Sequence, residues 1–247
     1  MTEVLDATGD TKVERDLLRV ENLSAAYGKI VAIEDVSLHV AAGEAVGIVG
    51  HNGAGKTTLL SSIFGTHPAQ KGRIFFDGEL HSSCGCAENI RDGMAFLLAD
   101  DYVFSSLTVE ENLAIAASNA SSKQNAESAM AVSRTLFPII WERRKQLAGT
   151  LSGGERRMVG IAMVLAWSPR LLLLDEPSVG LAPAMVGRLF SSLGQLRDGG
   201  LAMLCVEQNI PALLKLVDRV FILRAGRLIG EEKASTLANR DEFWDLV

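Results

Sequence analysis

The segment Gly50–Thr57, with the sequence GHNGAGKT, decides the fold because it matches the phosphate-binding pattern G-x-x-x-x-G-K-[ST] without exception. A strand-like run, Glu44–Val49, precedes it, and an apolar helix pattern begins at Lys56. Glycines allow the backbone to curl so that several N–H groups face one anion, and the N-terminus of the following helix adds partial positive charge. The segment therefore predicts a phosphate-binding loop between a strand and a helix, which its flanking elements favour over an ordinary glycine-rich turn.

The residue types in this loop predict a bound nucleotide and a divalent cation. We expect Lys56 to reach the β- and γ-phosphates and the hydroxyl of Thr57 to ligate Mg²⁺. The residues expected to surround the phosphates are Gly50, His51, Asn52, Gly53, Ala54, Gly55, Lys56, Thr57 and Thr58.

A second chemical signal lies at the end of another strand. The strand predicted at Leu171–Asp175 begins with a continuous apolar run, and Asp175 and Glu176 follow this run. Such a run is expected of a central parallel strand buried on both faces. Ligands of such sheets bind at the carboxyl ends of the strands. We expect Asp175 to complete the Mg²⁺ shell, directly or through water, and Glu176 to polarise an attacking water. A solvated loop is the alternative for this pair taken alone, and the phosphate-binding loop favours the catalytic interpretation.

Strand and helix patterns alternate along much of the chain. Leu18–Ser24 and Asp35–Val40 alternate apolar and polar residues, which is typical of half-buried antiparallel strands. The second half of the chain is expected to contain a helix from Gly153, strand Leu171–Asp175, a helix from Pro183, strand Leu201–Glu207, helix Pro211–Leu216 and strand Arg219–Leu223. Alternation at these lengths predicts an α/β fold with a parallel sheet and helices on both faces.

The stretch between about residues 105 and 152 interrupts this alternation. Thr108–Glu111 is a capping-box pattern, and the residues after it are rich in Ala, Ser, Glu and Arg without strand alternation. We expect a helical subdomain inserted at about residues 105–152. The chain is then one domain over residues 17–247, preceded by a flexible tail over residues 1–16.

A third motif, Leu151–Glu155 with the sequence LSGGE, lies between the phosphate-binding loop and the LLLLDEP of Leu171–Pro177. The order and spacing of these motifs resemble those of ABC transporter ATPases from about Leu17 onward, over nearly the whole chain. The resemblance implies a P-loop NTPase core of RecA-like type with a parallel sheet, an antiparallel β subdomain and an inserted α-helical subdomain. It also implies an enzyme that hydrolyses ATP with Mg²⁺ and couples hydrolysis to transmembrane transport.

The resemblance assigns a further set of residues to the nucleotide of a neighbouring subunit. Ser152, Gly153 and Gly154 open a helix with a capping-box pattern, and they are expected to bind the γ-phosphate of an ATP held by the other subunit. The chain carries one phosphate-binding loop and one such motif, so we expect it to dimerise. Tyr27 lies where ABC ATPases carry an aromatic side chain that stacks on adenine, with a half-buried core tyrosine as the alternative.

Four segments resemble the ATPases of branched-chain amino acid importers, namely Val103–Phe104, Leu107–Leu113, Ser178–Pro183 and Val206–Asn209. In many ABC ATPases a histidine that contacts the γ-phosphate stands at the position of Gln208, and glutamine donates a hydrogen bond but does not carry a proton. The subgroup implies integral-membrane permease chains, a second ATPase subunit that is either identical or different, and a periplasmic or surface substrate-binding protein. The expected location is the cytoplasmic face of the cell membrane.

Ala99 departs from the family pattern. After the run Met94–Leu98 the family carries a glutamine or glutamate that touches Mg²⁺ or the lytic water, and alanine offers no such group. Either Asp100 takes that role or hydrolysis is weakened, so the alternative function is a subunit that binds ATP and dimerises with weak or no hydrolysis. Ala182 replaces an aspartate, a substitution that is common in the subgroup.

The composition argues against other classes of protein. A formal net charge of −6 without a basic stripe argues against a nucleic-acid partner, and so against an ABC ATPase that acts on nucleic acid or ribosomes. The most apolar stretch, Met158–Trp167, is shorter than the roughly 20 residues that span a bilayer. Cys84 and Cys86 lack the spacing of a zinc site and are expected to be thiols in a loop.

Overall fold

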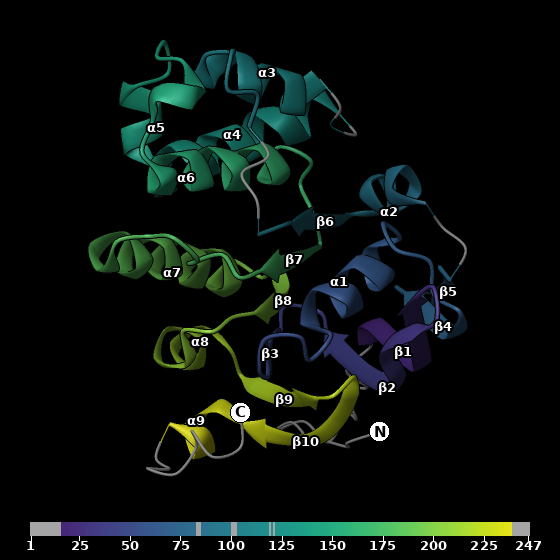
Figure 1. The fold of residues 1–247 in the computed structure, drawn as a ribbon. Coiled ribbons are helices and arrows are strands. Elements are labelled where there is room, and N and C mark those ends of the chain that lie inside the picture. Colours follow the sequence, from purple (N-terminus) through teal and green to yellow (C-terminus); the bar gives the residue numbers. More distant parts are fainter. Residues whose placement is uncertain (1–15, 83–84, 100–102, 119, 121, 239–247) are drawn as a thin grey trace, which may run out of the picture.

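The centre of the molecule is a six-stranded sheet in the order β10-β9-β3-β8-β7-β6 (Figure 1). The computed structural model describes residues 16–82, 85–99, 103–118, 120 and 122–238. The elements of this sheet are β3 (Ala45–Val49), β6 (Met94–Leu97), β7 (Leu171–Asp175), β8 (Ala202–Val206), β9 (Arg219–Arg224) and β10 (Arg227–Lys233), followed by helix α9 (Ala234–Leu237). Neighbouring strands from β9 to β6 run parallel, whereas β10 pairs antiparallel with β9. The predicted parallel sheet is confirmed, and the antiparallel edge strand is an addition that the alternating pattern does not predict.

Helices cover both faces of this sheet, as the alternating pattern predicts. Figure 1 shows α7 (Pro183–Asp198) and α8 (Ile210–Leu216) on one side of the sheet and α1 (Lys56–Phe64) on the other. Alternate side chains of β7 enter different cores, because Leu172 packs in the core that contains α7 and α8, whereas Leu173 packs in the core that contains α1. Burial on both faces explains why the strand is apolar at every position before its terminal aspartate.

A second, antiparallel sheet packs on the α1 side in the order β2-β1-β4-β5. Its strands are β1 (Asp16–Tyr27), β2 (Ile30–Ala41), β4 (Lys71–Phe76) and β5 (Glu79–Leu80). Buried residues of this sheet share one core with α1 and the central sheet, so the predicted antiparallel β subdomain is confirmed. The strand β1 begins at Asp16, which the sequence analysis places in the tail, and residues 1–15 lie outside the described residues.

The helical elements between β6 and β7 are α3 (Val109–Ser118), α4 (Lys123–Leu136), α5 (Pro138–Glu142), a 3₁₀ helix (Ala148–Thr150) and α6 (Gly153–Leu165). Figure 1 shows α3 to α6 gathered at the β6 end of the sheet, as the predicted fold requires of its helical subdomain. The capping box before α3 is formed: Glu111 Oε2 accepts from the Thr108 N–H at 2.7 Å, and Thr108 Oγ1 accepts from the Glu111 N–H at 3.2 Å. These reciprocal hydrogen bonds satisfy two backbone donors that the first turn of a helix leaves unpaired.

One helix contradicts the expectation for the cysteines. Helix α2 (Cys86–Asp92) begins at Cys86, so this thiol does not lie in a loop, while Cys84 falls outside the described residues. The buried side chain of Asn89 donates to the carbonyl oxygen of Phe64 at 2.9 Å, and its Oδ1 lies 2.9 Å from Nδ1 of His81. These contacts to distant parts of the chain stabilise a helix that is too short to form reliably by itself.

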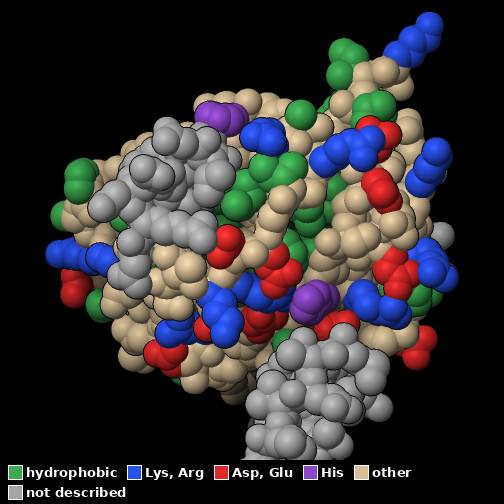
Figure 2. Space-filling view, turned by 90° about the horizontal axis from the view of Figure 1, so that it is seen from below, with side chains coloured by type: hydrophobic (Ala, Val, Ile, Leu, Met, Phe, Trp, Pro, Cys, Tyr) green, Lys and Arg blue, Asp and Glu red, His purple; other side chains and the backbone are tan. Residues whose placement is uncertain are grey.

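The end of the molecule where β10 lies carries charges of both signs. Figure 2 shows Lys and Arg side chains beside Asp and Glu side chains on this face. Arg219 donates from Nε to Glu44 Oε1 at 2.6 Å, from Nη1 to Glu231 Oε1 at 2.9 Å and from Nη2 to the carbonyl oxygen of His39 at 2.7 Å. The guanidinium therefore joins β9 and β10 of the central sheet to β2 of the antiparallel sheet.

Replacing Arg219 by Gln should lower the midpoint of thermal unfolding by about 2–8 °C at pH 7, and the loss should shrink in acid. Burial acts to raise the pKa of the Glu44 carboxyl, but hydrogen bonds from Arg219 and the Ala41 N–H outweigh it and hold this pKa below the ordinary 4.5. Folded protein thus binds fewer protons than unfolded protein, so the stabilisation is complete above pH 4.5 and is lost as the pH falls through the folded-state pKa.

Thermal unfolding followed by circular dichroism at pH 7 and near pH 4 checks this prediction. The control is Arg227→Gln, which removes an exposed pair with Glu34 and should change the unfolding temperature little. An Arg219→Gln loss that is equal at both pH values would contradict the assignment of the stabilisation to the Glu44 carboxylate.

Candidate active site

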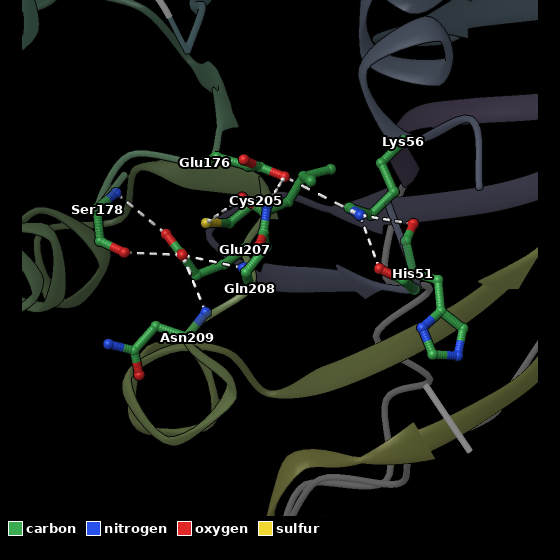
Figure 3. A network of polar contacts seen from close by, with 10 residues as sticks. His51, Lys56, Glu176, Ser178, Cys205, Glu207, Gln208 and Asn209 are labelled. Atoms are coloured by element: carbon green, nitrogen blue, oxygen red, sulfur yellow. Dashed lines mark hydrogen bonds and ion pairs between the residues drawn. The ribbon is translucent and has the colours of Figure 1, made fainter. Parts of the chain in front are cut away.

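The phosphate-binding loop leaves the carboxyl end of β3 and enters α1 at Lys56. Gly55 has a φ of +103°, a left-handed conformation that favours glycine, and a Cβ added there would lie 2.5 Å from the carbonyl oxygen of Ala32. The Nζ of Lys56 donates to the carbonyl oxygens of Gly50 at 2.7 Å and His51 at 3.1 Å (Figure 3). The ammonium group therefore lies close to the loop, where it would meet an anion bound by the loop N–H groups.

A cleft of about 490 Å³ opens beside this loop. The residues that line it are Tyr27, Ile30, Val31, Ala32, Asn52, Gly53, Gly55, Lys56, Thr57, Thr58, Glu176, Ala225 and Gly226. Most of the predicted nucleotide-binding residues are thus brought to one cleft. Three members of the predicted loop, namely Gly50, His51 and Ala54, shape the loop without lining the cleft.

The ring of Tyr27 lies at the wall of the cleft and not in the core. Its residue surface is 54% exposed, and its ring centroid lies 4.3 Å from that of His67 with an angle of 34° between the planes. An exposed aromatic ring supported from one side can stack on a flat base. Tyr27 is therefore not a half-buried core tyrosine, and its stacking on adenine stays a prediction.

The carboxylate of Glu176 faces Lys56 at this cleft (Figure 3). Its Oε1 lies 4.0 Å from Lys56 Nζ and accepts a hydrogen bond of 2.8 Å from Gln208 Nε2. The backbone of Glu176 is left-handed, with a φ of +45°, and its N–H donates to the carbonyl oxygen of Val206 at 2.9 Å. Such a conformation costs a non-glycine residue about 1–3 kcal/mol and is typical of functional sites. The structure thus brings together the three residues that the sequence assigns to catalysis, Glu176, Lys56 and Gln208.

Asp175 is fully buried at the end of β7. Neither oxygen of its carboxylate has a hydrogen-bond partner among the described residues. Burial raises the pKa of this carboxyl, and the Thr57 hydroxyl opposes the rise because it lies nearby, although it does not reach hydrogen-bond geometry. Two unsatisfied carboxylate oxygens beside a hydroxyl are the kind of oxygen ligands that Mg²⁺ prefers. Asp175 and Thr57 therefore fit a divalent cation.

The charge of Lys56 is also affected by its surroundings. Burial lowers the pKa of its ammonium group, and the negative charges of Glu176, Asp175 and Glu207 oppose that effect. A phosphate bound at the loop would add negative charge and favour the ammonium form further. The site is therefore electrostatically suited to an anionic ligand.

A carboxylate that the sequence analysis did not select, Glu207, connects two segments of the site (Figure 3). Only 1% of its surface is exposed, and it accepts hydrogen bonds from Ser178 Oγ at 2.7 Å, from the Ser178 N–H at 3.1 Å and from the N–H groups of Gln208 and Asn209 at 2.9 and 3.0 Å. These four donors satisfy the oxygens of a carboxylate that is almost fully buried. Glu207 thereby joins Ser178, which follows Glu176 in the chain, to Gln208, whose side chain contacts Glu176. Its place directly before Gln208 is the signal that could have identified it.

The residues expected to serve a second subunit lie apart from this cleft. Ser152 caps α6 with a complete capping box, in which Glu155 Oε2 accepts from the Ser152 N–H at 2.9 Å. A Cβ added at Gly154 would lie 2.9 Å from the Cε atom of Met185, so only glycine fits there without displacement of that side chain. Ser152, Gly153 and Gly154 are absent from the lining of the described cleft. Their predicted role therefore depends on another chain.

Ala99 ends the described part of the segment after β6. It is exposed, and its side chain offers no polar group toward the cleft. Asp100, the residue that could compensate, lies outside the described residues. The prediction about Asp100 therefore stays a prediction.

Comparison with known proteins identifies related sequences over most of the chain. The family model described as "ABC transporter" matches residues 33–179. The high-affinity branched-chain amino acid transport ATP-binding protein BraG of Pseudomonas aeruginosa is 40% identical over 229 residues, which cover 93% of this chain and 98% of that protein. The lipopolysaccharide export system ATP-binding protein LptB of Haemophilus influenzae is 34% identical over 229 residues, 92% of this chain and 94% of that protein.

Solved structures show the same fold. A nucleotide-free ATP-binding cassette from an ABC transporter has a TM-score of 0.83 and 24% identity, and the match covers 94% of this chain and 98% of that chain. No helix within the described ranges has the length and apolar character needed to cross a bilayer. The fold that the sequence motifs imply, a P-loop NTPase core with its two subdomains, is thus confirmed.

Proposed function

The chain belongs to the ABC transporter family as an ATP-hydrolysing subunit, and we propose a role in that reaction for each residue of the cleft. The observation that carries the proposal is the position of Glu176, whose Oε1 lies 4.0 Å from Lys56 Nζ beside the phosphate-binding loop. ATP binds with its phosphates on the loop N–H groups and Lys56, and with its adenine on Tyr27.

Thr57 and Asp175 hold Mg²⁺ in this proposal, because they offer a hydroxyl and two unsatisfied carboxylate oxygens side by side. The bound ion neutralises charge on the β- and γ-phosphate oxygens. Asp175 thereby also gains a partner for a carboxylate that is otherwise buried without one.

Glu176 acts as the general base, because it is the carboxylate that lines the cleft opposite the phosphate-binding loop. It accepts a proton from the water that attacks the γ-phosphorus, while the bond from the γ-phosphorus to the bridging oxygen breaks and ADP leaves. Gln208 donates to Glu176 Oε1 and so holds the carboxylate in place. Since the side chain of glutamine does not take up or release a proton, Gln208 orients the Glu176 carboxylate and does not itself transfer a proton.

A second ATPase subunit, either identical or different, completes the site. Ser152, Gly153 and Gly154 bind the γ-phosphate of the ATP held by that subunit, and the same residues of the second subunit bind the ATP held here. The start of α6 supports this role, because the backbone N–H groups and the partial positive charge of a helix N-terminus favour a phosphate. The second candidate function is a subunit that binds ATP and dimerises with weak or no hydrolysis, which the missing polar group at Ala99 favours.

The relatives support a proposal for the transported substrate. We propose that the chain powers import of branched-chain or related amino acids through a separate membrane permease, because the 40% identical protein of Pseudomonas aeruginosa serves branched-chain amino acid transport. The chain would then lie at the cytoplasmic face of the membrane, next to a permease that a substrate-binding protein supplies. Lipopolysaccharide export is the competing substrate class, since another relative belongs to that system.

Uptake by cells distinguishes these substrates. Cells that lack the gene are complemented with the wild-type chain or with Glu176→Gln, and the uptake of labelled leucine, isoleucine, valine and arginine is measured. We expect the wild type alone to restore uptake of the three branched-chain amino acids, with arginine uptake unchanged throughout. The proposed substrate would be wrong if cells that lack the gene took up leucine as fast as cells with the wild-type chain but carried less lipopolysaccharide at their surface.

Replacing Tyr27 by Ala should weaken ATP binding about tenfold, because stacking of one base on an aromatic side chain contributes about 1–3 kcal/mol. Tyr27→Phe is the matched control and should bind ATP within about twofold of the wild type, since the flat ring remains. Equilibrium titration with ATP under Mg²⁺-free conditions measures both. An equal loss in the two variants would mean that the hydroxyl, and not the ring face, contacts the nucleotide.

A further inference from the structure

A buried arginine, Arg157, lies one turn after the start of α6. Only 3% of its surface is exposed. A buried charge is strongly unfavourable unless hydrogen bonds satisfy it, so the partners of this guanidinium are the first question. Arg157 is not among the residues that the sequence motifs predict for the site.

Five backbone carbonyl oxygens accept hydrogen bonds from this one guanidinium. Nε donates to Pro177 at 3.1 Å, and Nη2 donates to Asp175 at 3.2 Å and Glu176 at 2.9 Å. Nη1 donates to Leu98 at 2.6 Å and Ala99 at 3.0 Å. Since a guanidinium has five N–H donors, it can donate to all five of these described acceptors at once.

The acceptors belong to two segments that are far apart in sequence and adjacent in space. Residues 98–99 follow β6, and residues 175–177 end β7 and follow it. Because β6 and β7 are parallel neighbours, their carboxyl ends lie at the same edge of the sheet. Arg157 therefore joins three parts of the site: the helix that begins at Ser152, the segment that carries Glu176, and the segment that ends in Ala99.

The hydrogen bonds from Arg157 to residues 175–177 are made on both sides of Glu176, the residue of the cleft with a strained backbone. Glu176 has a left-handed backbone. Arg157 donates hydrogen bonds to its carbonyl oxygen and to the carbonyl oxygens of the residues on either side, which stabilises this conformation. Five fixed acceptors around a planar donor define one arrangement of the two segments. A lysine has three donors in a different geometry and cannot reproduce this pattern.

We infer that Arg157 is a positioning residue for ATP hydrolysis, which holds Glu176 and the segment ending in Ala99 in register with the helix that starts at Ser152. The inference rests on the proposed role of Glu176. Ser152 is proposed to bind the ATP of the other subunit, and Arg157 lies on the same helix. Arg157 therefore joins the helix that would contact that ATP to the position of Glu176 in the cleft of this chain. The residue acts through these backbone groups and does not touch the nucleotide.

The test compares Arg157→Lys and Arg157→Gln with the control Arg219→Gln, which removes another multiply bonded arginine, partly buried and remote from the cleft. Phosphate release from Mg-ATP gives kcat and KM, equilibrium titration gives the ATP affinity, and hydrogen–deuterium exchange follows residues 175–179. Both Arg157 variants should lower kcat about tenfold or more, with ATP affinity within about twofold, since misplacement of a catalytic group reduces the rate without removing binding contacts. Exchange at residues 175–179 should be faster in these variants and unchanged in Arg219→Gln.

Unchanged exchange at residues 175–179, or a kcat within twofold of the wild type, would overturn the inference. So would an Arg157→Lys variant that does not fold while Arg219→Gln does, because Arg157 would then support the fold as a whole. Wild-type protein that shows no turnover above Glu176→Gln would instead count against the proposed function. In that case the exchange measurement still decides whether Arg157 holds the segment.

Discussion

Replacing Glu176 by Gln lowers the rate of phosphate release from Mg-ATP by about 100-fold or more, while ATP affinity stays within about threefold of the wild type. The reason is that glutamine keeps the size of the side chain and its contact with Gln208 but cannot accept a proton from water. Steady-state phosphate release measures the rate, and equilibrium titration with ATP measures the affinity.

The control for this result is Glu88→Gln, the same change at an exposed position in the first turn of α2. It should leave turnover unchanged. A Glu176→Gln variant with more than a third of the wild-type rate would show that another group activates the water, and the proposed base would be wrong.

Replacing Lys56 by Ala lowers ATP affinity by about 100-fold, because hydrogen bonds to a charged group are worth about 1.5–3 kcal/mol and Lys56 is the buried cation of the loop. The variant also removes the donor to the carbonyl oxygens of Gly50 and His51, so the loop loses part of its internal support. Titration with ATP gives the affinity, and circular dichroism during heating shows whether the variant remains folded.

Lys71→Ala is the matched control, since Lys71 is an exposed lysine at the start of β4. It should bind ATP as the wild type does. If folded Lys56→Ala protein bound ATP with unchanged affinity, the nucleotide would have to lie elsewhere than in the described cleft.

The fold around the loop could be predicted because its causes are local. The glycines of Gly50–Thr57 and the continuous leucines of β7 indicate a loop and a doubly buried strand by themselves, and α1 begins at Lys56 as expected. The motif spacing then identifies the family, which supplies the two subdomains. Helix α2 was not predicted because Asn89 stabilises it through contacts with Phe64 and His81, which only the folded chain brings together.

Only part of the site could be predicted, because the sequence shows the type of each residue but not the long-range contacts that the fold creates. Motifs identify Lys56, Asp175 and Glu176, whose chemistry is visible in the residue type. The residues that hold them in place are not visible in this way, because Glu207 and Arg157 act on backbone groups from other segments. Their partners become neighbours only through the order β6-β7-β8 in the sheet.

We propose that this chain hydrolyses ATP in a site that a second ATPase subunit completes. The most direct measurement is phosphate release from Mg-ATP over a range of chain concentrations, alone and with an ATPase subunit encoded by the same transport system. The rate per chain should rise with concentration, or on addition of the other subunit, and should disappear in Glu176→Gln. A rate per chain that is constant with concentration and indifferent to the other subunit would contradict the proposal, because one chain would then hold the complete site.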